Sequence, residues 1–103
     1  MAELVTVGKA EEIAEGTAKA YSVGGQEIAV ARTGGKLYAF SDICTHRACN
    51  LAMGGELEGT TIQCECHGSI FDISDGSVVQ GPATEPVATF VVSEEDGELR
   101  IQV

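Results

Sequence analysis

Two short pairs of metal-binding side chains stand in the middle of the chain. Cys44 and His46 form a Cys-x-His pair, Cys64 and His67 form a Cys-x-x-His pair, and seventeen residues separate the two pairs. Thiolate and imidazole donors together suit iron–sulfur clusters or zinc, and they disfavour magnesium and calcium, which prefer oxygen ligands. We therefore expect two short loops that close around one metal centre.

The order of the donors bears on which metal they bind. A structural zinc site of this composition usually takes both Cys from one loop and both His from the other. Here each loop offers one Cys and one His. A 2Fe–2S centre in which the two Cys bind one iron and the two His bind the other would take one ligand for each iron from each loop. The order favours this centre, and zinc and a site that holds only a disulfide are the competing interpretations.

The residues around these pairs resemble a known family. The strings Cys44-Thr45-His46 and Cys64-Glu65-Cys66-His67-Gly68-Ser69 closely resemble the signature of Rieske proteins. Gly81-Pro82-Ala83 resembles the proline loop that covers the cluster in that family. The resemblance implies one Rieske-type 2Fe–2S cluster, and its four ligands would be Cys44, His46, Cys64 and His67.

The resemblance also bears on the reduction potential. Two neutral imidazoles in place of two thiolates raise it from about −400 mV to between about −150 and +300 mV. Ser69 matches the family serine whose hydroxyl donates to a cluster sulfur, and Pro82 lies in the covering loop. High-potential members have a tyrosine where this chain has Phe71. The charges of Glu65, Asp42 and Asp72 would oppose reduction if they lay close to the cluster. An intermediate potential is predicted.

Two cysteines, Cys49 and Cys66, remain once the ligands are assigned. In the high-potential Rieske proteins of cytochrome bc complexes, cysteines at these two places form a disulfide, whereas many oxygenase ferredoxins lack it. The resemblance predicts a Cys49–Cys66 bridge, which would stabilise the fold by about 3 kcal/mol. The alternative is a pair of reduced, buried thiols, as cytosolic conditions would favour.

Short β-branched runs between glycines predict an all-β domain. We expect strands over residues 4–7, 17–23, 26–32, 36–40, 88–92 and 99–103, with Gly34-Gly35 leading into the fourth of them. Residues 9–15 would form a short turn or a half-turn of helix, and turns are expected at Gly24-Gly25 and Asp96-Gly97. The strands alternate well enough to form one antiparallel sheet system.

A single domain is expected over residues 1–103. Its β scaffold would comprise residues 1–41 and 85–103, and a cluster-binding subdomain would span about 42–84. The family resemblance implies the Rieske (ISP-domain-like) fold, an antiparallel β sandwich of stacked sheets.

The charge of the chain restricts its partners. Sixteen Asp and Glu against six Lys and Arg give a formal charge of −10, which argues against nucleic acid and anionic membrane surfaces. The same charge favours docking on a basic protein or simply keeps the protein soluble. No apolar run approaches the roughly 18 residues of a membrane span, and no secretory signal is visible. A cytoplasmic monomer is expected.

The residues offer an electron store without substrate chemistry. Both histidines of the chain are assigned to the cluster, so a mononuclear iron site of two His and one carboxylate cannot form. There is also no Gly-x-Gly-x-x-Gly motif for a nicotinamide or flavin. We therefore expect an electron carrier and not an enzyme.

The resemblance narrows the setting to the ferredoxin of a bacterial aromatic-ring-hydroxylating dioxygenase system of the biphenyl, benzene or carbazole type, in aromatic hydrocarbon catabolism. Such a ferredoxin takes single electrons from an NAD(P)H-dependent flavoprotein ferredoxin reductase and passes them to a terminal Rieske non-haem iron oxygenase. The alternative is a small Rieske subunit of a larger oxidoreductase such as arsenite oxidase, whose members carry the disulfide.

Overall fold

The computed structural model describes residues 4–43, 50–52, 55–66 and 68–102. Within these ranges the regular elements are strands and one 3-10 turn: β1 (Leu4–Lys9), η1 (Ala10–Glu12), β2 (Thr17–Val23), β3 (Gln26–Thr33), β4 (Lys36–Ser41), β5 (Glu56–Glu58), β6 (Thr61–Gln63), β7 (Ile70–Asp72), β8 (Val78–Gln80), β9 (Thr89–Phe90), β10 (Val92–Glu95) and β11 (Glu98–Gln102). No helix in the described part of the chain is long and apolar enough to cross a membrane.

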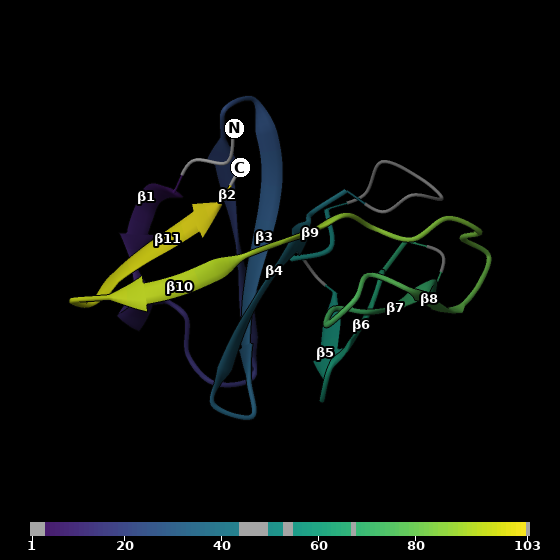
Figure 1. Cartoon of the computed structure of the whole chain (residues 1–103). Helices are drawn as coiled ribbons and strands as arrows, with labels where there is room; N and C mark the ends of the chain where they lie inside the picture. The colour runs from purple at the N-terminus through teal and green to yellow at the C-terminus, as the bar shows by residue number, and fades with distance from the viewer. Residues whose placement is uncertain (1–3, 44–49, 53–54, 67, 103) are drawn as a thin grey trace.

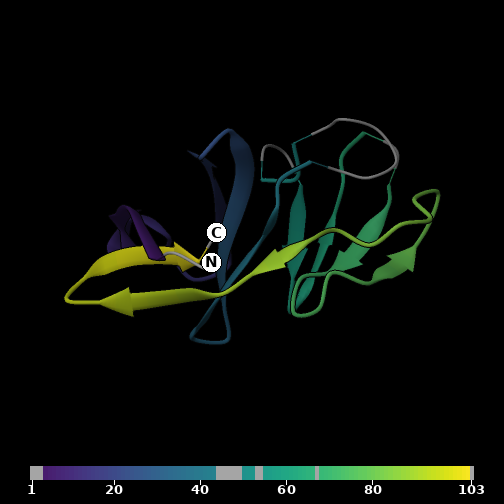
Figure 2. The same cartoon turned by 45° about the horizontal axis from the view of Figure 1, so that its top comes forward.

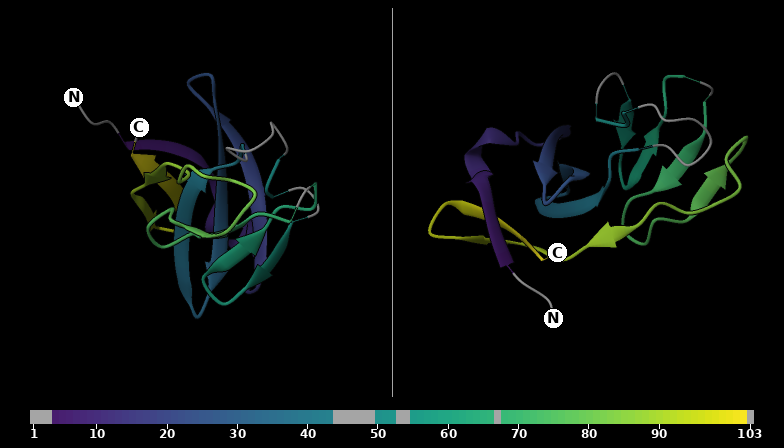
Figure 3. Two further views of the ribbon diagram at one scale, coloured as in Figure 1. Left: turned by 90° about the vertical axis from the view of Figure 1, so that its right-hand side faces the viewer. Right: turned by 90° about the horizontal axis from the view of Figure 1, so that it is seen from above.

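The strands form three antiparallel sheets that follow one another along the long axis of the molecule (Figures 1 and 3). We call β1-β11-β10 the terminal sheet, β2-β3-β4-β9 the central sheet and β5-β6-β7-β8 the distal sheet. Figure 2 shows the central sheet standing between the other two. The predicted all-β sandwich of stacked antiparallel sheets is confirmed. The strands that were expected to form one antiparallel sheet system are divided between the terminal sheet and the central sheet.

The residues of β3 explain the stacking. Ile28, Ala29, Val30 and Ala31 are all fully buried, although side chains of a strand alternate between its faces. Ile28 and Val30 pack in one apolar cluster with Leu99 and Ile101 of the terminal sheet. Ala29 and Ala31 pack in a second cluster, together with Phe40, Leu51, Ile62 and Phe71. A continuous apolar run in a strand is typical of burial on both faces.

The predicted hairpins are present. Gly24 and Gly25 between β2 and β3, and Asp96 and Gly97 between β10 and β11, all have positive φ. Type I′ turns need positive φ at both central residues, so glycine and aspartate suit these positions. The predicted helical turn within 9–15 is the 3-10 turn η1.

The single strand expected over residues 88–92 is divided in two. β9 pairs with β4 of the central sheet, whereas β10 pairs with β11 of the terminal sheet. The chain passes from one sheet to the other at Val91, whose side chain is 60% exposed. The run of residues expected to form one strand thus supplies one strand to each of two sheets.

The distal sheet is connected to the central sheet by two chain segments that lie side by side. The Ser41 N–H donates to the Ala88 carbonyl oxygen at 2.8 Å, where the chain leaves β4 and where it returns toward β9. Between these points lie the predicted ligand strings and the proline loop.

Candidate metal centre

The second ligand string forms the tip of the β6–β7 hairpin. Gln63 pairs with Ile70 in the sheet. Beyond this pair, the Cys64 N–H donates to the Ser69 carbonyl oxygen at 2.8 Å. The Gly68 N–H donates to the Cys64 carbonyl oxygen at 3.0 Å, and Gly68 has φ +81°. This left-handed conformation favours glycine. The hairpin therefore fixes the backbone on both sides of residues 65–67.

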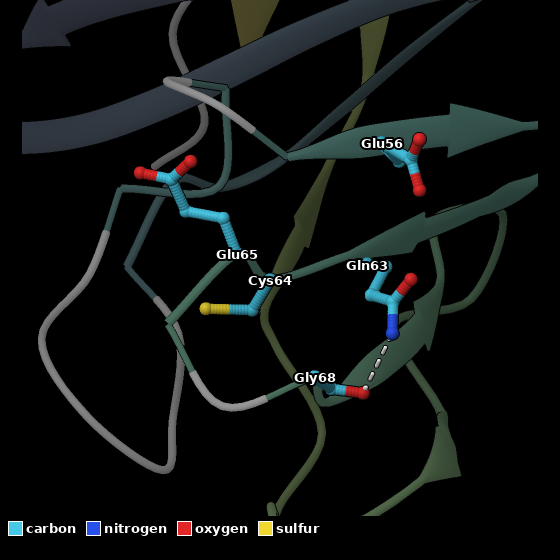
Figure 4. A pocket seen from close by; sticks show the side chains of 5 residues that line it. All are labelled: Glu56, Gln63, Cys64, Glu65 and Gly68. Carbon is cyan, nitrogen blue, oxygen red and sulfur yellow. Dashed lines mark hydrogen bonds between the residues drawn. The ribbon is translucent and has the colours of Figure 1, made fainter.

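Cys64 is buried at the base of this tip. Its exposed fraction is 2%, and it belongs to the same apolar cluster as Phe71 and Leu51. Its side chain points away from Gln63 and Glu56, as Figure 4 shows. On the outer side, a pocket of about 360 Å³ is lined by Glu56, Gln63, Cys64, Glu65 and Gly68. One thiol group is thus held in a fixed, largely apolar place at the end of a strand.

The segment that carries the first ligand string is closed at its base by pairing between residues 42–43 and 50–51. Ile43 and Asn50 form an isolated antiparallel bridge, and the Leu51 N–H donates to the Asp42 carbonyl oxygen at 2.6 Å. The Asp42 carboxylate is fully buried and accepts hydrogen bonds of 2.7 Å from Asn50 Nδ2 and from the Ala52 N–H. Both ends of the segment that carries Cys44 and His46 are therefore fixed at one place.

The proline loop is tied to the hairpin by a buried hydroxyl. Ser69 is fully buried, and its Oγ accepts a 3.0 Å hydrogen bond from the Ala83 N–H. Pro82 is exposed, and its bond to Gly81 is cis. Farther along, the Val87 N–H donates to the Gly76 carbonyl oxygen at 2.9 Å. The segment that returns to β9 is thus held against the distal sheet at two points.

The model of the Rieske [2Fe-2S] domain matches residues 3–91 of the chain. The chain belongs to the Rieske [2Fe-2S] domain family. The family predicted from the two ligand strings is thereby confirmed, and the structural neighbours described below confirm the Rieske fold.

Relatives of this Rieske chain include ferredoxins and a larger subunit. The ferredoxin component of the naphthalene 1,2-dioxygenase system of Pseudomonas aeruginosa is 34% identical over 92 residues, 89% of this chain and 88% of that protein. The cytochrome b6-f complex iron-sulfur subunit of Chlorobaculum tepidum is 32% identical over 99 residues, but the chain spans only 53% of its length.

Solved structures agree with the sequence relatives. The ferredoxin of carbazole 1,9a-dioxygenase from Nocardioides aromaticivorans IC177 superposes with a TM-score of 0.89 at 29% identity, over 95% of each chain. A chain in a complex of reduced oxygenase and oxidised ferredoxin of carbazole 1,9a-dioxygenase gives 0.87 at 33% identity, over 95% of this chain and 91% of that chain. The Rieske chain is therefore homologous to ferredoxin electron carriers of aromatic dioxygenase systems, as predicted.

The predicted site residues divide between described and undescribed parts of the Rieske chain. Cys64, Cys66, Ser69 and Pro82 are described, whereas Cys44, His46, Cys49 and His67 lie outside the described residues. Cys66 is exposed and disulfide-bonded. The pairing of Cys66 with Cys49 and the four-ligand set remain predictions.

The described residues fit a Rieske cluster in their chemistry. Cys64 offers a soft thiolate donor in an apolar setting, which is the kind of ligand that iron–sulfur clusters use. The Ser69 oxygen is engaged as an acceptor, so its own hydrogen remains available for a cluster sulfur. Among the described residues, no group of three or more His, Cys, Asp or Glu side chains could hold a metal elsewhere.

The three carboxylates expected to oppose reduction differ in position. Asp42 is buried at the base of the first ligand segment, and Glu65 is exposed at the hairpin tip. Asp72 pairs with Thr61, at the other end of the hairpin, roughly 10 Å along the strand from Cys64. Its carboxylate accepts hydrogen bonds from the backbone and hydroxyl of Ser74. Its charge therefore acts more weakly on the site than its sequence position suggests.

Sequence reasoning missed the role of Asp42 in the fold. In the sequence, Asp42 stands out only as a charge near Cys44, and nothing there marks Asn50 or Ala52 as its partners. An aspartate two residues before a ligand and an asparagine six residues after it could have suggested a closed loop, because such side chains often bond to nearby backbone.

Proposed function

We propose that this chain is an electron-transfer ferredoxin of a bacterial aromatic-ring-hydroxylating dioxygenase system. It would take single electrons from an NAD(P)H-dependent flavoprotein reductase and deliver them to a terminal Rieske non-haem iron oxygenase. The observation that carries the proposal is the match to dioxygenase ferredoxins over nearly their whole length, 88% for the naphthalene system.

The cofactor in this proposal is one Rieske-type 2Fe–2S cluster held by Cys44, His46, Cys64 and His67. When bound, it supplies a one-electron couple near the protein surface. The chain holds Cys64 at the hairpin tip, aligns Ser69 between the hairpin and the proline loop, and keeps this region apolar through Leu51 and Phe71. We also propose the single domain over 1–103, with the cluster-binding subdomain at about 42–84.

The distribution of charge supports docking on basic partners. Residues 42–88 contain seven carboxylates and one basic residue, Arg47. The ion pairs between described residues all lie in the scaffold: Lys19–Glu12, Arg32–Glu94, Arg100–Glu95 and Arg100–Glu98. The half of the molecule that carries the ligand strings is therefore strongly negative, which attracts a cationic surface and raises the association rate.

Hydrogen bonding lowers the pKa of one of these carboxyl groups. The Ser77 N–H donates to Asp75 Oδ1 at 2.9 Å and holds the pKa of that carboxyl below its ordinary value. Glu56 and Glu58 are exposed on one face of β5, since alternate residues of a strand share a face. Glu56 pairs with Gln63, the residue before Cys64, whereas Glu58 pairs with Thr61 at the other end of β6. Together they give the outer strand of the distal sheet a negative face.

Spectroscopy and reconstitution test the proposal. The purified protein should contain iron and acid-labile sulfide and show a rhombic EPR signal only after reduction with dithionite. With NADH and a flavoprotein ferredoxin reductase, it should reduce cytochrome c. A colourless protein that contains zinc without sulfide would refute the cluster, and a bound cluster that no reductase reduces would refute the carrier role.

The disulfide favours a second candidate function. Cys66 is disulfide-bonded, as predicted for high-potential members and for the small Rieske subunits of arsenite oxidase. Under this alternative the chain would be a permanent subunit of a larger oxidoreductase. Purification from the native host distinguishes the two, because a subunit would elute with its partner at fixed stoichiometry, whereas the carrier would elute alone as a cytoplasmic monomer.

A further inference from the structure

Asp42 is a buried carboxylate in a position that needs explanation. Its exposed fraction is 0%, and the only other buried polar side chain among the described residues is Ser69. None of the ion pairs between described residues includes Asp42. Burying a carboxylate without a cation is unfavourable unless hydrogen bonds stabilise it. The buried carboxylate of Asp42 therefore depends on the hydrogen bonds that it accepts, which an apolar side chain at this position would not form.

The hydrogen bonds that Asp42 makes with described residues lie at the junction between the central sheet and the first ligand string. Its backbone N–H donates to the Glu27 carbonyl oxygen at 2.9 Å, which fixes Asp42 to the start of β3. Its own carbonyl accepts from the Leu51 N–H, and its carboxylate accepts from Asn50 Nδ2 and the Ala52 N–H. One residue thereby joins the sheet, the beginning of the loop and the end of the loop.

We propose that Asp42 is the positioning residue of the first ligand segment: by binding Asn50 and Ala52 with its buried carboxylate, it fixes both ends of the segment that carries Cys44 and His46, and it thereby slows the loss of the bound cluster. The proposal rests on the cluster assigned above. The bonds to Asn50 and Ala52 join the end of this segment to its beginning, and fixed loop ends restrict the motion of the residues between them.

Three variants test this role on the cluster-loaded protein. Asp42→Ala removes both carboxylate bonds and leaves the Ala52 N–H without its acceptor, and Asn50→Ala removes one bond. The exchange Asp42→Asn with Asn50→Asp keeps both bonds. In the exchange, an amide at position 42 accepts from Ala52 and donates to a carboxylate at position 50. Leu99→Ala, in the core cluster on the terminal side, is the control for general loss of stability.

Two measurements are made on each protein. The first is the rate at which visible absorbance bleaches in the presence of an iron chelator, and the second is hydrogen exchange of a peptide that contains Leu51 and Ala52. Bleaching should be about tenfold faster in Asp42→Ala than in Leu99→Ala, since loss of these bonds favours local opening. Asn50→Ala should fall between wild type and Asp42→Ala. The exchange variant should return both rates to about those of wild type.

The outcomes separate this proposal from the function that it rests on. Bleaching in Asp42→Ala no faster than in Leu99→Ala would overturn the positioning role, and so would an exchange variant as labile as Asp42→Ala. If Asp42→Ala does not fold, Asn50→Ala and the exchange variant decide in the same way. A wild-type protein without iron and sulfide would instead refute the proposed cluster.

Discussion

The Ala83 N–H donates a 3.0 Å hydrogen bond to Ser69 Oγ and so ties the proline loop to the hairpin that carries Cys64. Both residues are buried, with Ser69 at 0% and Ala83 at 3% exposure. Because Ser69 is the acceptor in this bond, its hydroxyl hydrogen can serve a second partner. The same side chain can therefore hold the covering loop and influence the cluster.

Replacement of Ser69 by Ala tests both roles. The variant leaves the Ala83 N–H without an acceptor in the interior, so the free energy of unfolding should fall by about 1–3 kcal/mol. If the hydroxyl also donates to the cluster, the reduction potential should fall. Urea unfolding and voltammetry measure the two effects, with the exposed Ser22→Ala in β2 as control. An unchanged reduction potential would contradict a hydrogen bond from Ser69 to the cluster, but not the role of Ser69 in holding the proline loop.

Gly76 lies where a turn of the distal sheet contacts the returning segment. It has φ +83°, and a Cβ there would overlap the Val87 carbonyl oxygen. Gly59 has φ +57° with open space around it, so it is the matched control. Gly59→Ala should cost about 1–2 kcal/mol from backbone strain, and Gly76→Ala about 3 kcal/mol or more because overlap adds to strain. Equal unfolding midpoints in urea would contradict the contact with Val87.

Phe71 stands where high-potential relatives have a tyrosine. It is fully buried and belongs to the same apolar cluster as Cys64. Phe71→Tyr should raise the reduction potential modestly, since an added hydroxyl donor stabilises the reduced, more negative state. Phe40→Tyr makes the same chemical change in another strand of that cluster. A rise of the same size in both variants would assign the effect to general polarity.

The negative face of the distal sheet predicts a salt-dependent rate of reduction. Glu56→Gln with Glu58→Gln should slow electron delivery from the reductase about three- to tenfold at low salt and weaken its salt dependence. Glu11→Gln with Glu27→Gln removes the same charge from the scaffold. Stopped-flow reduction measures these rates. Equal slowing by both pairs would show that net charge alone matters.

We expect the free energy of unfolding to fall in alkali because of Tyr21. Burial, the largest cause, and the nearby Glu12 carboxylate raise the pKa of Tyr21 to about 12 from its ordinary value of 10.0. Since the folded state holds the proton more tightly, this contribution to stability is complete below pH 10 and is lost as pH rises toward 12. Tyr21→Phe should flatten the urea midpoint between these values. A wild-type midpoint that is flat there would contradict the shift.

Local sequence signals predicted the elements better than their arrangement. Glycine pairs and β-branched runs placed the hairpins from β2 to β4 and the turn at Asp96-Gly97, because turn geometry depends on neighbouring residues. The change of sheet at Val91 was missed. Strand periodicity records which residues are apolar, but it does not record which of two sheets each one joins.

The site shows the same limit. The ligand types and the order of Cys and His indicated the family, because that chemistry restricts the residues strongly. The closure by Asp42 and Asn50 and the contact of Gly76 with Val87 depend on segments brought together by folding. Single-sequence reasoning has no measure of such distances.

The division of β3 between large and small side chains also restricts how the strand can pair. Ile28 and Val30 face the terminal sheet, while Ala29 and Ala31 face the distal side beneath Leu51, Ile62 and Phe71. A shift by one residue would exchange the two sets, crowding bulky groups on one side and leaving voids on the other. The unequal volumes of neighbouring side chains thus favour a single alignment of the central strands, and through it a single packing of the distal sheet, with Cys64, against the central sheet.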